Sequence, residues 1–197
     1  MSPREAIQYA NHVHELLNLI EGLAKPVLAA INGFAFGGGC QIALACDLRI
    51  ASINARIGQP EVKIGISPGW GGTQRLSRII GISKAKELIY TGKIIDANEA
   101  LRIKLINKIV RLNDDEKQQD FPLIKNAILL KEKLLQECIS IAESINSSYP
   151  IVTKTCKVLI NKARDVDSDT AILLEYLAFR YCLNDLIKER ENLRKKQ

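Results

Sequence analysis

The chain opens with apolar positions at helical spacing and continues with apolar runs that are too short for helices. Over residues 2–23 the apolar positions recur every three or four residues, which predicts an amphipathic helix. Its start at residues 2–5 reads Ser-Pro-Arg-Glu, a combination typical of a helix N-terminus. The apolar run at 26–31 indicates a buried strand, because it is brief and is followed by turn residues, and residues 48–52 predict a second strand.

Strand and helix signals alternate as far as residue 111, and helical spacing dominates afterwards. Further elements of the first part are predicted at 40–46, 84–91 and 97–101 as helices and at 106–110 as a strand. Residues 112–122 are polar and predict a surface loop. The last part predicts long helices at 124–145, 151–163 and 168–194. We therefore expect the α/β fold class, with an α/β core over 1–111 and a helical region over 123–197.

The composition favours a globular protein and argues against nucleic-acid and membrane partners. Of the 197 residues, 47% are hydrophobic and 25% are charged, which suits one buried core with an appended helical part. Much of the net charge of +6 lies in residues 188–197, where basic side chains are typical of a solvated helix end. Aromatic residues make up only 5%, and no groove-reading motif is present. No apolar run is long enough to cross a bilayer, so we expect a cytoplasmic location, with an organellar one left open if the N-terminus is incomplete.

The cysteines and histidines do not predict a metal site. Five cysteines are spread along the chain without a CxxC pair, so we expect buried, reduced thiols. His12 and His14 stand two positions apart on a predicted helix and therefore point in different directions. We expect neither a disulfide framework nor a bound metal.

A strand, a glycine turn and an apolar helix follow one another between residues 26 and 46. Gly37, Gly38 and Gly39 stand directly before the helix. The first N–H groups of a helix lack intrahelical acceptors and carry partial positive charge, and glycine lets a ligand approach the main chain. We interpret this turn as a backbone site that polarises a carbonyl group. Tight packing of strand on helix, with no ligand, is the alternative reading, since the spacing matches neither the dinucleotide nor the P-loop motif.

Glu61 is the candidate acid or base for the same site. It is the only carboxylate between Asp47 and Glu87, and it follows Pro60 in an apolar stretch that is predicted to consist of short extended pieces. A carboxylate in apolar surroundings near a glycine turn can take and return a proton. Gln41, at the start of the buried helix, can orient water or substrate but cannot exchange protons at neutral pH.

The glycine-rich loop at residues 65–72 contains a pattern that we reject and a tryptophan that we retain. Residues 65–69 match G-x-S-x-G, but Pro68 follows the serine and has no N–H to donate to an oxyanion. Both histidines also precede this serine, so a serine hydrolase is rejected. Trp70 is the only tryptophan and is suited to wall a pocket, with a place in the core or in a subunit interface as the alternative.

Three segments together resemble one known family. Residues 29–52 read AAINGFAFGGGCQIALACDLRIAS, residues 58–81 read GQPEVKIGISPGWGGTQRLSRIIG, and residues 91–110 read TGKIIDANEALRIKLINKIV. They resemble the crotonase superfamily, which comprises enoyl-CoA hydratases and isomerases. The resemblance is close up to about residue 110 and looser in the helical region.

The resemblance implies a fold, a substrate and a set of site residues. The fold would be a spiral of ββα units with a helical region that assembles trimers or dimers of trimers. The substrate would be an acyl-CoA thioester, with no cofactor other than the coenzyme A that it carries. Gly38 matches an oxyanion donor, Glu61 matches the second of two catalytic glutamates, and Gln41 stands at the position of the first. We expect the rest of the substrate site to be lined by Gly37, Pro60, Gly69 and Trp70.

Two departures from the family pattern set the alternatives. With Gln41 in place of a carboxylate, the resemblance favours a double-bond shift by Glu61 over strong hydration. The family's early strands and its other oxyanion donor have no counterpart in this sequence, so we expect an N-terminally short member: a truncated product, a fragment or a lineage that has lost the site. The first hypothesis is an enzyme of the enoyl-CoA hydratase/isomerase type. The second is a non-catalytic structural or regulatory subunit, or a fragment without full activity.

Overall fold

The computed structural model describes residues 2–117 and 122–194, and the chain separates into two compact units. The first unit contains the chain up to Leu23 together with Val27–Ala142. The second contains Ala24–Pro26 and the chain from Glu143 onward. The glycine turn and Glu61 both belong to the first unit.

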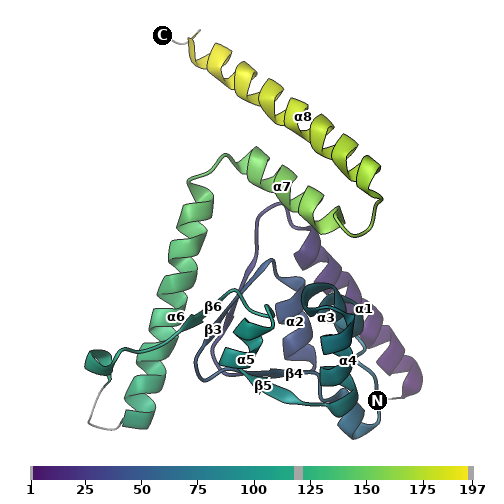
Figure 1. Ribbon diagram of the computed structural model, residues 1–197, viewed down its shortest axis with the longest axis vertical. Helices are drawn as coiled ribbons and strands as arrows, with labels where there is room; N and C mark the ends of the chain where they lie inside the picture. Colours follow the sequence, from purple (N-terminus) through teal and green to yellow (C-terminus); the bar gives the residue numbers. More distant parts are fainter. Residues whose placement is uncertain (1, 118–121, 195–197) are drawn as a thin grey trace. The chain divides into compact units, whose positions relative to one another are not determined.

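Two successive strand–strand–helix units form the centre of the first unit (Figure 1). The elements of the first are β1 (Leu28–Ile31), β2 (Phe34–Phe36) and α2 (Gly38–Ala45), and those of the second are β3 (Leu48–Ser52), β4 (Arg56–Gly58), the 3-10 turn η1 (Glu61–Ile64), α3 (Gly72–Ile80) and α4 (Ile82–Thr91). Corresponding strands pair in parallel, β1 with β3 and β2 with β4. The two strand–strand–helix repeats are therefore stacked as successive turns of a spiral, which confirms the predicted fold class.

Two further strands and a short helix complete the sheets. β6 (Lys108–Val110) pairs in parallel with β3, giving the sheet order β1-β3-β6. β5 (Ile94–Asp96) runs antiparallel to β4, giving the order β2-β4-β5. Between them lies α5 (Ala97–Arg102), which begins as predicted with the Asp96 side chain accepting a hydrogen bond from an N–H of its first turn.

The first helix, α1 (Pro3–Gly22), has the start that its sequence predicts. The Ser2 hydroxyl accepts a hydrogen bond from the Glu5 N–H at 3.3 Å, and the Glu5 carboxylate accepts one from the Ser2 N–H at 2.7 Å. This reciprocal pair satisfies donors that the helix itself leaves free. On the buried face of the helix, Leu17 is completely enclosed.

The prediction was wrong at three short elements. β2 and β5 are each three residues long, and the sequence indicated neither as a strand. A period of two cannot be read over three residues, and both strands exist because they pair with β4. The stretch after β4 was predicted to be extended, but Glu61–Ile64 forms a 3-10 turn in which the Lys63 N–H donates to the Pro60 carbonyl at 2.8 Å.

The long helix α6 (Pro122–Asn146) belongs to the first unit as far as Ala142. Its Leu130 and Leu134 are buried with Ile50 and Val110 in a small apolar cluster on the β1-β3-β6 sheet. The division of the chain thus falls inside α6, whereas the sequence pattern placed the change at residues 111–123. The predicted polar loop contains one 3-10 turn, η2 (Asp114–Glu116), and residues 118–121 of that loop lie outside the described residues.

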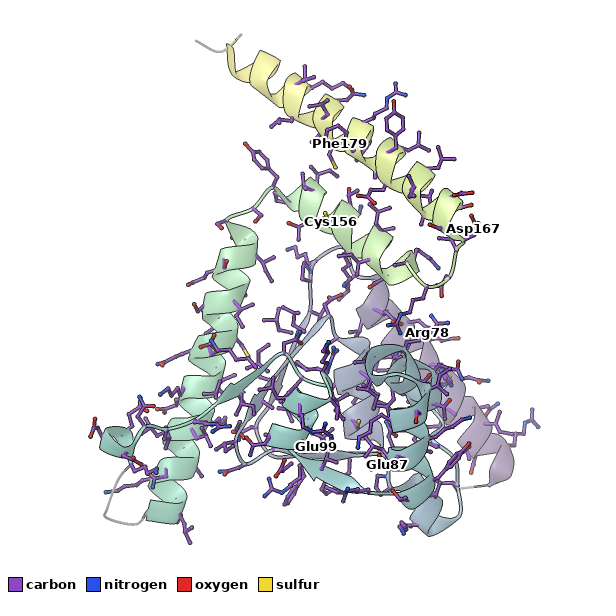
Figure 2. The ribbon with its side chains drawn as sticks, viewed as in Figure 1. Arg78, Glu87, Glu99, Cys156, Asp167 and Phe179 are labelled. Atoms are coloured by element: carbon purple, nitrogen blue, oxygen red, sulfur yellow. The ribbon has the colours of Figure 1, made fainter. Side chains whose placement is uncertain are left out.

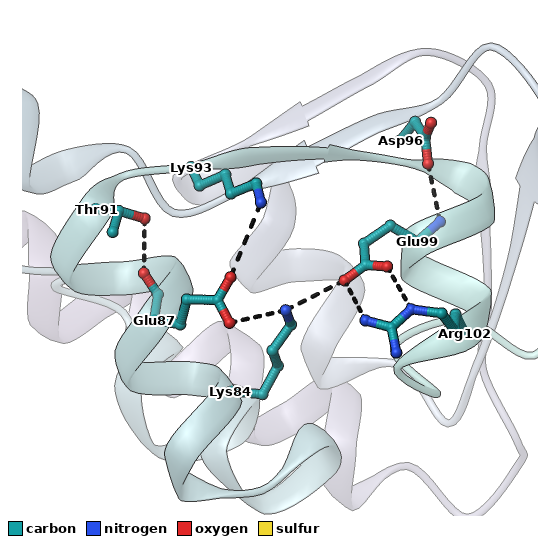
Figure 3. A network of polar contacts seen from close by, with 7 residues as sticks. All are labelled: Lys84, Glu87, Thr91, Lys93, Asp96, Glu99 and Arg102. Atoms are coloured by element: carbon teal, nitrogen blue, oxygen red, sulfur yellow. Dashed lines mark hydrogen bonds and ion pairs between the residues drawn. The ribbon is translucent and has the colours of Figure 1, made fainter.

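A network of ion pairs joins α4 to α5 on the surface of the first unit (Figure 3). Lys84 Nζ lies 2.8 Å from a Glu87 carboxylate oxygen and 3.2 Å from a Glu99 carboxylate oxygen. Arg102 Nε lies 2.6 Å from the other Glu99 oxygen. The hydrogen bonds from Arg102 and then from Lys84 lower the pKa of Glu99 to about 2.

We expect the Glu99 ion pairs to stabilise the fold above the ordinary glutamate pKa of 4.5 and to be lost as the pH falls toward 2. The sign follows because the folded-state pKa is the lower one, so the unfolded chain binds the proton first. An NMR titration of the Glu99 carboxyl carbon should give a midpoint near 2, and Arg102→Ala should move it upward. A midpoint near 4.5 in the parent protein would contradict the network.

The second unit pairs α7 (Pro150–Lys162) with α8 (Ser168–Arg194). A groove of about 430 Å³ lies between them, and Cys156 and Phe179 are among its mainly apolar lining residues (Figure 2). Lys157 is 8% exposed and donates from Nζ to the Lys25 carbonyl at 3.2 Å.

The last helix, α8, continues to Arg194, as the pattern predicts. Most side chains of the basic tail lie outside the part that the structure describes. Within the described ranges, no helix combines the length and apolar character that crossing a bilayer requires.

None of the five cysteines, all of which lie within the described residues, forms a disulfide, and only Cys40 is fully buried. Cys156 is exposed and the other three are half-buried, so the expectation of buried thiols was wrong for four of them. The four lie in or beside helices whose outer faces reach the surface.

Candidate functional site

The carboxylate of Glu61 is buried and is held by two glutamine side chains. Glu61 is 8% exposed and stands at the first position of η1. Gln41 Nε2 donates to Glu61 Oε1 at 2.8 Å. The Gln59 amide, oriented with its nitrogen toward the carboxylate, donates to Oε1 at 2.7 Å and lies 3.2 Å from Oε2. These charge-assisted hydrogen bonds fix the direction of the carboxylate.

The same carboxylate borders the glycine turn. Gly37 has a φ of +50°, which L side chains rarely adopt, and a methyl group placed there would lie 3.4 Å from Glu61 Oε1. The Gly37 N–H donates to the Gly58 carbonyl at 3.0 Å, which ties the turn to the end of β4. Glycine at this position allows the backbone conformation, and the place of its missing side chain lies in contact with Glu61.

The N–H of Gly38 is one of the main-chain donors at the start of α2 that have no acceptor within the described residues. Gly38 is the first residue of α2, and within the described part of the chain its N–H has no hydrogen-bond acceptor. The neighbouring Gly37 and Gln41 N–H groups are both bonded, to Gly58 and Gly37 respectively. A free N–H at the start of a helix favours an anionic or strongly polarised oxygen.

Gln41 links α2 to the glycine-rich loop as well as to Glu61. It is 2% exposed, and its Oε1 accepts hydrogen bonds from the Trp70 N–H at 2.7 Å and the Gly72 N–H at 3.0 Å. An amide oxygen has two lone pairs, so both are used by the protein. In the structure the Gln41 side chain holds Glu61 and the loop, and its role in orienting water or substrate stays a prediction.

The three remaining predicted residues lie around this centre at different depths. Pro60 is half-buried directly before η1, where its carbonyl accepts the first bond of the turn. Gly69 is exposed, and nothing lies closer than 4.0 Å to a methyl group placed on it. Trp70 is half-buried, and its six-membered ring lies directly over the Cα of Gly38. The structure therefore brings Gly37, Gly38, Gln41, Glu61 and Trp70 together, with Gly69 at the surface beside them.

Substitution of Gly38 by alanine is expected to push Trp70 out of position. The added methyl group would overlap the indole ring, and overpacking of this kind costs about 1–3 kcal/mol. Gly39→Ala is the matched control, because a methyl group there meets nothing within 4 Å and gains the same helix propensity. Thermal unfolding and the fluorescence of Trp70, the only tryptophan, report the two effects. Equal stability and equal spectra for the two variants would contradict the packing.

Two supporting residues, Gln59 and Arg75, were not among the residues predicted from the sequence. Gln59 is 1% exposed at the end of β4, and a polar residue next to a buried strand and two positions before Glu61 is a signal that could have found it. Arg75 is 9% exposed, and its Nη1 donates to the Trp70 carbonyl at 3.0 Å. It also pairs with Glu21 of α1 at 2.9 Å. Its burial could not be read from the sequence, because its partners lie far away along the chain.

The thiol of Cys40 lies behind this site but does not provide a nucleophile. Burial raises the pKa of Cys40 to about 12, and the nearby negative charge of Glu61 acts in the same direction. The thiol therefore stays protonated at neutral pH. Among the residues that the structure describes, no three His, Cys, Asp or Glu side chains gather to hold a metal ion.

Comparison with known proteins finds relatives over nearly the whole chain. The family model for enoyl-CoA hydratase/isomerase matches residues 1–189. A short-chain-enoyl-CoA hydratase from Clostridium acetobutylicum is 47% identical over 174 residues, which are 88% of this chain and 58% of that protein. A crotonyl-CoA hydratase from Syntrophomonas wolfei is 42% identical over 182 residues, which are 92% of this chain and 63% of that protein. The chain thus spans about three fifths of the length of these two relatives.

A solved structure matches the same arrangement. The crystal structure of an enoyl-CoA hydratase from Bacillus anthracis superposes with a TM-score of 0.82 at 35% sequence identity. The match covers 100% of this chain and 70% of that one. The similarity therefore extends over both units of the chain.

Proposed function

Because the chain belongs to the enoyl-CoA hydratase/isomerase family, we propose that it acts on an acyl-CoA thioester through the Gly38 N–H and the Glu61 carboxylate. The observation that supports this most is the buried Glu61 carboxylate against the glycine turn, beside a free N–H at the head of α2. A thioester oxygen on that N–H would place its α-carbon near the carboxylate. One preorganised donor of this kind is worth about 3–4 kcal/mol of barrier.

The proposed chemistry is proton transfer through an enolate. Glu61 removes a proton from the α-carbon of a β,γ-unsaturated thioester, and the electron pair of the C–H bond moves into the carbonyl group. The Gly38 N–H stabilises the negative charge that develops on the oxygen. Glu61 then returns the proton to the γ-carbon, and the double bond moves to the α,β position. One carboxylate is sufficient, because Glu61 gives back the proton that it took and is deprotonated again at the end of the reaction.

Hydration makes a further demand that Gln41 does not meet. Addition of water to an α,β-unsaturated thioester requires a proton acceptor for the water and a proton donor for the α-carbon. An amide cannot accept a proton at neutral pH, and both lone pairs of the Gln41 oxygen are already used. Glu61 alone would have to serve both steps. We therefore propose that the chain shifts double bonds faster than it adds water.

The proposal includes the coenzyme and the oligomer. Coenzyme A enters as part of the substrate, and the proton transfer needs no other cofactor. The exposed apolar residues of the second unit, including Leu173, Leu177 and Phe179 of α8, supply a surface for self-association into a trimer or a dimer of trimers. The relatives' names, a short-chain-enoyl-CoA hydratase and a crotonyl-CoA hydratase, support short unsaturated acyl groups as the first substrates to assay.

Two steady-state assays on the purified full chain test the function. Crotonyl-CoA measures hydration, and a β,γ-unsaturated acyl-CoA measures isomerisation. We expect turnover in the second assay to exceed that in the first. If neither assay shows turnover, titration calorimetry with butyryl-CoA, which neither reaction consumes, separates two explanations. Binding without turnover identifies a non-catalytic member of the family. Absence of binding would mean that the chain does not act on acyl-CoA.

A further inference from the structure

An aromatic wall stands beside the first turn of α2. The six-membered ring of Trp70 lies so close to the Cα of Gly38 that a methyl group there would overlap it. The Tyr9 ring, on α1, meets the Trp70 ring edge-on, with centroids 5.7 Å apart and an interplanar angle of 70°. This edge-to-face arrangement is favourable for aromatic pairs, so Tyr9 helps to hold the Trp70 ring in place. We call Trp70 and Tyr9 the aromatic wall.

The main chain of Trp70 is fixed on both sides. Its N–H donates to Gln41 Oε1 at 2.7 Å, and its carbonyl accepts from Arg75 Nη1 at 3.0 Å. Arg75 in turn donates from Nη2 to Asn18 and to Glu21 of α1, each at 2.9 Å. The aromatic wall is therefore anchored to α1 and α2, although Trp70 itself stands in a loop.

The proposed base and the aromatic wall contact neighbouring glycines: Glu61 lies beside Gly37, and Trp70 lies beside Gly38. Glu61 Oε1 is 3.4 Å from the position of a methyl group on Gly37, and the indole occupies the corresponding position on Gly38. A thioester carbonyl held by the Gly38 N–H, with its α-carbon at Glu61, would have its first acyl carbons near both the carboxylate and the indole. An acyl chain that continued toward Trp70 would meet the aromatic wall.

We propose that the aromatic wall sets the acyl-chain length, so that short acyl groups such as crotonyl fit and long ones are excluded. This inference rests on the proposed function, because it concerns the acyl group at the same site. Trp70 acts here as a specificity-determining residue, and Tyr9 as a positioning residue that acts through Trp70. The shape of an apolar pocket separates acyl chains by their length alone, since added methylene groups carry no polar atom to recognise.

Titration calorimetry with two saturated ligands, butyryl-CoA and decanoyl-CoA, tests the wall without any turnover. The parent chain is expected to bind butyryl-CoA at least about tenfold more tightly than decanoyl-CoA. Trp70→Ala is expected to abolish or reverse this preference, chiefly by tightening decanoyl-CoA. Because Trp70 is the only tryptophan, its fluorescence in the parent chain should also change when butyryl-CoA binds.

If Trp70→Ala folds poorly, a second variant, Tyr9→Ala, tests the same preference for acyl-chain length. Tyr9 is 52% exposed on α1, so Tyr9→Ala leaves the helix and the Trp70 hydrogen bonds in place while removing the support. It should shift the preference in the same direction by a smaller factor. An unchanged preference in both variants, with butyryl-CoA still bound, overturns the inference and leaves the proposed function standing. Failure of the parent chain to bind either ligand overturns both.

Discussion

Replacement of Glu61 by glutamine is expected to lower acyl-CoA turnover about 10²–10⁴-fold, the usual contribution of a positioned general base. The change keeps the size of the side chain but removes the group that can accept a proton. Binding should survive, because the Gly38 N–H is untouched and the two glutamine donors still have an amide oxygen to contact. Steady-state rates with the better of the two substrates measure the loss, and titration with butyryl-CoA measures the binding.

The matched control for this variant is Glu87→Gln. Glu87 carries the same side chain in the same unit, but it lies in the surface ion-pair network with Lys84 and Lys93 (Figure 3). We expect its turnover to equal that of the parent chain. Equal turnover in Glu61→Gln as well would mean that another group moves the proton.

Replacement of Gln41 by glutamate is expected to raise hydration of crotonyl-CoA by about 10²-fold or more relative to isomerisation. The new carboxylate would stand where the amide nitrogen now lies, 2.8 Å from Glu61 Oε1, and could accept the proton of an attacking water. Its other oxygen keeps the N–H donors of Trp70 and Gly72. Two carboxylates this close share one proton, which leaves one basic and one acidic partner for the two steps of hydration.

Gln41→Ala provides the comparison that separates chemistry from position. It leaves the Trp70 and Gly72 N–H groups without their acceptor and Glu61 with Gln59 as its remaining glutamine donor. Unsatisfied buried groups cost about 1–3 kcal/mol each, so we expect a lower melting temperature and a loss of both activities. If Gln41→Glu folds but hydrates crotonyl-CoA no faster than the parent chain, the absence of a second carboxylate is not what limits hydration.

Elements with local signals could be predicted from the sequence, and elements defined by pairing could not. The capping box of α1 and the helix start at Asp96 follow from residues three positions apart. β1 and β3 could be read directly from the sequence as strands; β3 is largely buried as a strand in the middle of its sheet, whereas in β1 only Ile31 is fully buried, so the prediction of a buried strand at 26–31 was wrong for most of its residues. β2 and β5 are too short to show an alternating pattern. They are strands because they form hydrogen bonds with β4, and this pairing exists only in the folded chain.

The candidate site was predictable in its chemistry but not in its connections. The glycine turn and the lone carboxylate are local features of the chain, and they single out Gly38 and Glu61 as candidates from the sequence alone. The hydrogen bonds of Gln41 reach residues 20, 29 and 31 positions away, and no sequence period reports contacts of that span. Arg75 was not predicted because Asn18 and Glu21 lie 57 and 54 positions away, whereas Gln59 lies two positions before Glu61 and carried a local signal that was not used.

Exchange of the α-protons of butyryl-CoA in deuterium oxide isolates the proton transfer by Glu61, because it needs neither hydration nor a double-bond shift. If Glu61 removes an α-proton while the Gly38 N–H holds the thioester oxygen, the parent chain will incorporate deuterium at the α-carbon, as read by mass spectrometry. With the Glu61→Gln variant, the α-carbon of butyryl-CoA is expected to exchange no faster than it does in buffer without protein. Incorporation by Glu61→Gln at the rate of the parent chain would contradict it.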